Sequence, residues 1–75
     1  DRAERIAADA TLTAKIKSKM ALDDNIDAVD IDIDTADAVV TLRGTVGSQD
    51  ERERAVRMAR ETEGVTSVVD QLVIR

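Results

Sequence analysis

The fold is decided by residues 29–46, which read VDIDIDTADAVVTLRGTV. Apolar side chains occupy alternate positions in two runs, Val29, Ile31 and Ile33 in the first and Val40, Leu42 and Val46 in the second. A period of two is typical of strands that bury one face. The connection Thr35-Ala36-Asp37 is so short that the two strands are expected to form an antiparallel hairpin.

A second helix and a last strand are expected after the hairpin. Ser48 and Glu51 fit a capping box, in which each side chain bonds the other residue's backbone N–H. The apolar side of this helix is supplied by Ala55, Val56, Ala59 and Met58. Ion pairs at i, i+4 spacing are expected on its outer face, namely Asp50–Arg54, Glu53–Arg57 and Arg57–Glu61. Gly64 is expected to end the helix in a left-handed conformation, before a strand over residues 65–74.

A longer helix is expected before the hairpin. Apolar residues recur at helical spacing over residues 3–22, and neither Gly nor Pro interrupts them. Asp9 and Thr11 are alternative N-caps of a shorter helix. The polar residues 23–27 form the connection to the hairpin. The order α-β-β-α-β predicts an α+β fold in which two helices pack on one face of a three-stranded sheet.

The composition restricts the chemistry of the chain. Its 75 residues are expected to form one domain, 1–75. The absence of Cys and His excludes a disulfide framework and a Cys/His zinc site, and removes the commonest catalytic base and the best nucleophile. The absence of aromatic residues removes stacking platforms for bases, and the net charge of −5 argues against nucleic acid as a partner. We therefore expect a binding domain with no catalytic residues, cofactor or metal.

Several of these positions together resemble the BON domain family. The matching positions are Ala38, Val40, Leu42, Gly44 and Val46, then Ala55 and Ala59, then Gly64, Val65, Val68, Asp70, Leu72 and Ile74. The resemblance covers residues 9–74. It departs at Ala38, where the family usually has Gly, and at Asp70, where Asn is common. Ala38 predicts a hairpin turn that avoids the positive φ that Gly permits.

The resemblance implies a non-catalytic module of osmotically inducible periplasmic proteins and other bacterial envelope proteins. The implied partner is phospholipid membrane, or alternatively another envelope protein or a second BON domain in the same chain. The implied location is the periplasm or the cell envelope. Because the chain begins at Asp1 without Met, the lack of a signal peptide in it carries no information about export. No stretch has the roughly 20 apolar residues of a membrane span.

Lysines of the first helix are the predicted membrane-binding residues, namely Lys15, Lys17 and Lys19. A basic residue close to an anionic lipid surface contributes ~1 kcal/mol of attraction. On a helix, Lys15 and Lys19 share a side, whereas Lys17 points elsewhere. The alternative is that all three only make the helix soluble.

A sheet face without helices is the predicted protein interface, through Val39, Arg43, Val69 and Val73. If Val40, Leu42, Val68 and Leu72 face the helices, then strand alternation places these four residues on the opposite face. Thr41, Thr45 and Gln71 share that face. Three valines on an uncovered face suit a partner or a second copy, and scattered exposed valines are the alternative.

Two charged segments are interpreted as solvated surface. Arginine binds phosphates well, but glutamates interleave the series Arg52, Arg54, Arg57 and Arg60 and favour internal pairing. The acidic residues 23–37 imitate the opening of a calcium loop through Asp23, Asn25 and Asp27. Ala28, however, stands where that loop needs Gly, so a calcium-responsive module is the third hypothesis.

Overall fold

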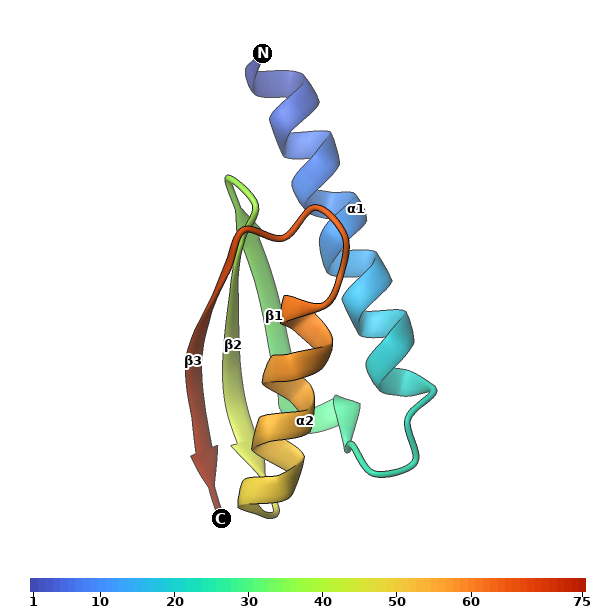
Figure 1. The fold of residues 1–75 in the computed structure, drawn as a ribbon, viewed down its shortest axis with the longest axis vertical. Helices are drawn as coiled ribbons and strands as arrows, with labels where there is room; N and C mark the ends of the chain where they lie inside the picture. The colour runs from blue at the N-terminus through green and yellow to red at the C-terminus, as the bar shows by residue number, and fades with distance from the viewer.

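The computed structural model describes residues 1–75 and has the expected order of elements (Figure 1). The elements are helix α1 (Arg2–Ala21), the 3-10 turn η1 (Ala28–Asp30), strands β1 (Ile31–Ala36) and β2 (Val39–Val46), helix α2 (Gln49–Arg60) and strand β3 (Ser67–Ile74). The prediction of an α+β fold with two helices and three strands is confirmed. Both helices lie on the same side of the sheet in Figure 1.

The sheet has the order β1-β2-β3, so the second strand is central and the other two are edges. β1 and β2 are antiparallel, with Ile33 opposite Leu42. β2 and β3 are parallel, with Val40 opposite Val68. A parallel pair needs a crossover connection, and α2 supplies it. The helix is therefore held against the sheet by the chain connections at both of its ends.

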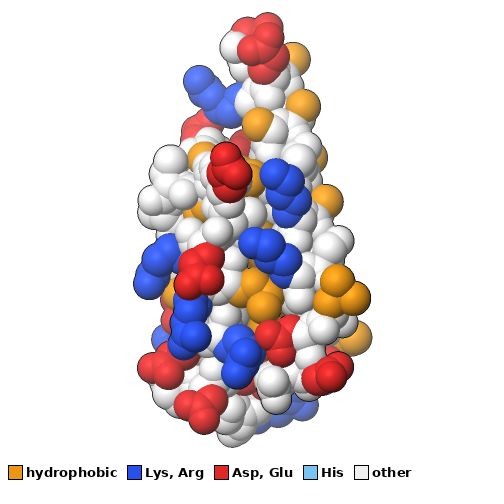
Figure 2. Space-filling model, turned by 45° about the vertical axis from the view of Figure 1, so that its right-hand side comes forward, with side chains coloured by type: hydrophobic (Ala, Val, Ile, Leu, Met, Phe, Trp, Pro, Cys, Tyr) orange, Lys and Arg blue, Asp and Glu red, His pale blue; other side chains and the backbone are white.

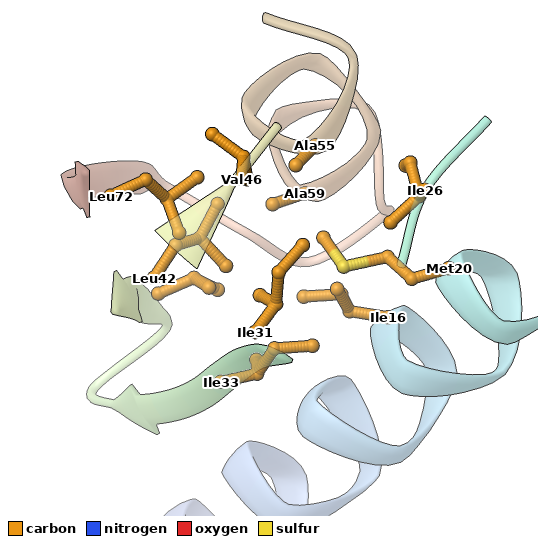
Figure 3. Packing of buried hydrophobic residues seen from close by; sticks show 11 residues of the cluster. Ile16, Met20, Ile26, Ile31, Ile33, Leu42, Val46, Ala55, Ala59 and Leu72 are labelled. Carbon is orange, nitrogen blue, oxygen red and sulfur yellow. The ribbon is translucent and has the colours of Figure 1, made fainter. Parts of the chain in front are cut away.

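The core lies between the helices and the sheet and is entirely aliphatic apart from the thioether of Met20 (Figure 3). Ile16 and Met20 of α1 are fully buried, as are Val40, Leu42 and Val46 of β2. From α2 only the small side chains Ala55 and Ala59 are fully buried. Because alanine adds little bulk, α2 can approach the sheet closely while the large side chains come from the other elements.

The hairpin turn differs from the prediction. β1 continues through Ala36, and the turn is the pair Asp37-Ala38, with φ of 51° and 65°. Positive φ at both central residues is the geometry of a type I′ turn, whose twist matches that of the flanking strands. The expectation that Ala38 avoids positive φ was therefore wrong. The twist requirement of a two-residue hairpin overrides the left-handed penalty of alanine, about 1–2 kcal/mol.

The carboxylate of Asp9 supports this turn. Its two oxygens accept hydrogen bonds from the backbone N–H groups of Asp37, at 2.9 Å, and Ala38, at 3.0 Å. The guanidinium of Arg5 pairs with the carboxylate of Asp37 at 3.3 Å. Asp9 thus caps the hairpin and not a helix, and the left-handed turn is bound to α1.

Helix α1 begins at Arg2, where the side chain of Asp1 accepts a hydrogen bond from the backbone N–H of Glu4. The shorter helix starting near Asp9 or Thr11 is therefore wrong. The hydroxyl of Thr11 donates to the carbonyl of Ala7 within the helix. The N-terminal turns of α1 extend beyond the hairpin end of the sheet in Figure 1, and Ile6 on them is 59% exposed.

The first strand begins two residues later than predicted. Val29 lies in η1 and is 93% exposed, so it does not share the buried face of Ile31 and Ile33. The side chain of Asp27 caps this turn by accepting from the backbone N–H of Val29. A local cap of this kind competes with the strand ladder, and here it prevails over the period of two.

Gly44 allows η1 to lie against the centre of the sheet. Its φ is 119°, and an added Cβ would stand 2.0 Å from the backbone carbonyl oxygen of Asp30. Only glycine tolerates both the conformation and the contact. The backbone that approaches so closely is the carbonyl of Asp30, the last residue of η1.

One of the two hydrogen bonds of the predicted capping box is present at the start of α2. The hydroxyl of Ser48 accepts from the backbone N–H of Glu51 at 3.1 Å, as expected. The carboxylate of Glu51 instead accepts from the N–H groups of Gly47, at 2.8 Å, and Asp27, at 3.0 Å. One carboxylate therefore connects the start of α2 to the loop before η1.

The end of α2 also differs from the prediction. The helix ends at Arg60, and Glu61 caps it in a right-handed conformation. Gly64, with φ of 100°, lies beyond it at the third position of a turn closed by the hydrogen bond from Val65 N–H to the Thr62 carbonyl. The left-handed conformation was predicted correctly, but it serves this turn and not the helix end. β3 begins at Ser67 and not at residue 65.

Candidate functional site

The predicted membrane-binding lysines are all exposed on α1, but they do not form one cluster. Lys19 donates from Nζ to the hydroxyl of Thr62 at 3.0 Å, which directs it towards the loop after α2. Lys15, one turn earlier, borders a hollow that also contains Gly64. Lys17 lies on the opposite flank of the helix, since it is two residues from each. The structure therefore groups Lys15 with Lys19 and separates Lys17.

Leu22 adds an exposed apolar side chain to this group. It follows Lys15 and Lys19 at helical spacing of seven and three residues, directly after α1, and is 84% exposed. Lys19, Leu22 and Met58 border one shallow hollow. Sequence reasoning missed Leu22, although its i, i+4, i+7 relation to the two lysines was visible. We call Lys15, Lys19 and Leu22 the α1 ridge.

The helical side of the molecule carries both signs of charge. Figure 2, which looks more directly onto the helices, shows Lys and Arg side chains separated by Asp and Glu. No buried side-chain polar atom lacks a hydrogen-bond partner. Neither helix is long and apolar enough to span a bilayer.

The four residues of the predicted protein interface lie together on the sheet face away from the helices. The register places Arg43 beside Gln71 and Thr45 beside Val73. Arg43 donates from Nε to the Gln71 side-chain oxygen at 3.2 Å. Val69 is 41% and Val73 is 61% exposed, whereas Val39 is partly covered. Asp32 and Asp34 of β1 border this surface, which we call the open sheet face.

The acidic residues 23–37 are distributed over several local contacts. Asp23 accepts from the backbone N–H of Asn25 at 2.8 Å and pairs with Arg54 at 3.6 Å. Asp30 pairs with Arg75. No group of three acidic side chains converges in a way that could hold a metal ion. Asp34, which is the twelfth residue counted from Asp23 and stands where a calcium loop has its last ligand, lies within β1.

The arginines of α2 do not pair along their own helix, so the predicted i, i+4 pairs are absent. Arg52 instead pairs with Asp70 of β3, with 2.8 Å between Nε and Oδ2, and Arg54 pairs with Asp23. These partners are distant in sequence, so a pattern confined to one helix does not reveal them. Arg57 and Arg60 form no ion pair.

The chain therefore forms an α-β-β-α-β module whose hairpin turns at Asp37-Ala38 and whose central strand contains Gly44. The sequence matches the BON domain over residues 8–75, and the chain belongs to the BON domain family. It is similar to the osmotically-inducible protein Y of Escherichia coli (strain K12), with 48% identity over 67 residues. That region is 89% of this chain and 33% of the relative, so the chain spans about a third of the relative's length. These matches support a non-catalytic module.

Proposed function

We propose that this domain tethers its protein to anionic phospholipid membrane in the bacterial cell envelope. The observation that carries the proposal is the α1 ridge, in which two lysines and one exposed leucine follow each other along one side of α1. Lysine attracts anionic head groups, and an exposed leucine gains free energy when it enters the acyl boundary. No bond is made or broken in this mechanism.

The envelope location rests on the family and on the osmotic induction that the relative's name states. The chain matches the BON domain over residues 8–75, and the resemblance to that family implies an envelope protein. Lipid contact through the domain surface would hold such a protein at the membrane of the envelope.

The expected affinity of one domain is low. Two lysines near the surface contribute about 2 kcal/mol, and burial of Leu22 contributes about 1.5–3 kcal/mol. Their sum of roughly 4 kcal/mol corresponds to a dissociation constant of about 1 mM. The net charge of −5 opposes approach to an anionic surface, so attachment is local to the ridge and sensitive to salt.

Co-sedimentation with liposomes tests the proposal. The domain is expected to sediment with phosphatidylglycerol vesicles at low salt and to be released at physiological salt, because Debye screening weakens the lysine attraction. Binding to neutral phosphatidylcholine vesicles is expected to be much weaker. The double variant Lys15→Gln/Lys19→Gln is expected to lose most of the bound fraction, roughly tenfold or more in affinity.

The matched control is Lys17→Gln, which removes one positive charge from the opposite flank of the same helix. It is expected to retain most of its vesicle binding. If Lys17→Gln lost about half as much binding free energy as the double variant, the loss per charge would be the same on both flanks, and net charge, not the ridge, would control binding. Failure of the unmodified domain to bind any vesicle would contradict membrane tethering.

A second candidate function is the packing of a second BON domain, or another envelope protein, on the open sheet face. The observation that favours it is the exposure of Val69 and Val73 beside the central Arg43. The curated relative is about three times as long as the matched region, which leaves length for another domain in such proteins. A domain that binds no vesicle but dimerises, and that Val73→Lys keeps monomeric, would favour this candidate.

A further inference from the structure

A polar groove runs between α2 and the edge strand β3, on the side of α2 away from the α1 ridge. Its volume is about 590 Å³, and three arginines of α2 line it, Arg52, Arg57 and Arg60. Two carboxylates, Glu53 and Asp70, and the partly buried Val56 are also at its walls. The arginines give the groove a positive excess in a chain whose net charge is −5.

Two of these arginines have no acidic partner. Arg57 and Arg60 form no ion pair, although Glu53 and Glu61 lie at i, i+4 spacing from Arg57. Because an exposed pair of that kind would contribute only about 0.3–0.5 kcal/mol, these glutamates compete weakly with a strongly charged ligand for Arg57. Internal pairing along α2 therefore does not account for the arginine series.

The third arginine is held in place. Nε of Arg52 donates to Oδ2 of Asp70 at 2.8 Å, and Oδ1 of Asp70 accepts from the backbone N–H of Leu72 at 3.0 Å. Arg52 and Asp70 are 35% and 28% exposed at their side chains, so this pair is partly shielded. Asp70 uses only Nε of the guanidinium, and the two Nη groups are left as donors to a ligand. A guanidinium held in this way can donate two parallel N–H hydrogen bonds to the oxygens of one phosphate.

We infer that this groove binds phosphate groups, with one phosphate between Arg57 and Arg60 and a second near Arg52. The helical rise of ~1.5 Å per residue places Arg57 and Arg60 about 4.5 Å apart along the axis and Arg52 about 7.5 Å from Arg57. Long arginine side chains bridge these separations, so the spacing suits a diphosphate or the head groups of two adjacent phospholipids. The carboxylates of Glu53 and Asp70 oppose any anion, so the attraction comes from the excess of positive charge that the three arginines provide.

Inorganic pyrophosphate is the probe that tests the groove without a membrane. In a titration followed by ¹H–¹⁵N NMR at constant ionic strength, the amide shifts are expected to concentrate on residues 49–60 and 68–72. The double variant Arg57→Gln/Arg60→Gln is expected to weaken binding roughly tenfold or more. Lys15→Gln/Lys19→Gln, which removes the same charge from the α1 ridge, is expected to leave pyrophosphate binding unchanged.

Vesicles of phosphatidylglycerol distinguish the source of the phosphate. If the double arginine variant also loses vesicle binding, the groove takes lipid head groups; if it keeps vesicle binding, the groove takes a soluble phosphate compound. Absence of any localised shift with pyrophosphate, or equal weakening by the lysine and arginine variants, would overturn the inference. The lysine variant in the same vesicle assay tests the α1 ridge separately, so failure of one site leaves the other standing.

Discussion

Replacing Gly44 with alanine is expected to lower the free energy of unfolding by about 2–6 kcal/mol. Two costs add at this position. Alanine at a φ of 119° is strained, which costs about 1–3 kcal/mol. Its Cβ would also lie 2.0 Å from the carbonyl oxygen of Asp30, and the backbone shift that removes such an overlap costs a further 1–3 kcal/mol or so. A domain of this length has a total stability of only about 4–11 kcal/mol.

Urea unfolding followed by far-UV circular dichroism measures this effect, and Gly47→Ala is the matched control. Gly47 is three residues away, has no positive φ, and an added Cβ would meet only the flexible Glu51 side chain at 3.4 Å. The control is expected to change the unfolding free energy by less than about 1 kcal/mol. Similar effects of the two substitutions would contradict the packing of η1 on Gly44.

The second large effect is expected from Ile16→Ala in α1. Ile16 is fully buried between the helices and the sheet, so its truncation removes apolar contacts and leaves a cavity. Such substitutions cost about 2–5 kcal/mol. Because the chain has no aromatic residue, no large neighbouring ring can fill the space. We expect the variant to retain little stability at room temperature.

Ile6→Ala makes the same chemical change on the same helix. Ile6 lies on the part of α1 that extends beyond the sheet and is 59% exposed. Alanine also has the better helix propensity, so the unfolding free energy is expected to change by less than about 0.5 kcal/mol. A large loss in Ile6→Ala, or a small one in Ile16→Ala, would show that α1 packs differently.

The sequence predicts most of the fold because its periodicity is clear. Ile31 and Ile33 alternate with aspartates, and Ser48 begins α2 as its spacing from Glu51 indicates. The errors occur where a contact distant in sequence determines local geometry. Asp9 holds Ala38 in a left-handed turn, and Asp23 pairs with Arg54, whose predicted partner was Asp50.

The candidate sites are less accessible to sequence reasoning than the fold. The placement of Val69 and Val73 follows from strand alternation alone, because only one face of this sheet is covered. Leu22 was missed because its exposure depends on where α1 ends and the chain turns. The groove at Arg57 could not be predicted, since it exists only where α2 lies beside β3.

The most direct test of membrane tethering uses the absence of aromatic residues in the chain. Leu22→Trp introduces a single fluorophore at the end of the α1 ridge, where the native side chain is 84% exposed. Val73→Trp places the same fluorophore on the open sheet face. Emission spectra of both variants are recorded with and without phosphatidylglycerol vesicles at low salt.

The tethering account predicts a blue shift and a stronger emission for tryptophan at position 22 when vesicles are added, because the indole enters the acyl boundary. Tryptophan at position 73 is predicted to stay in water and to keep its spectrum. A blue shift only at position 73, or unchanged spectra at both positions, would contradict attachment of this domain to membrane through the α1 ridge.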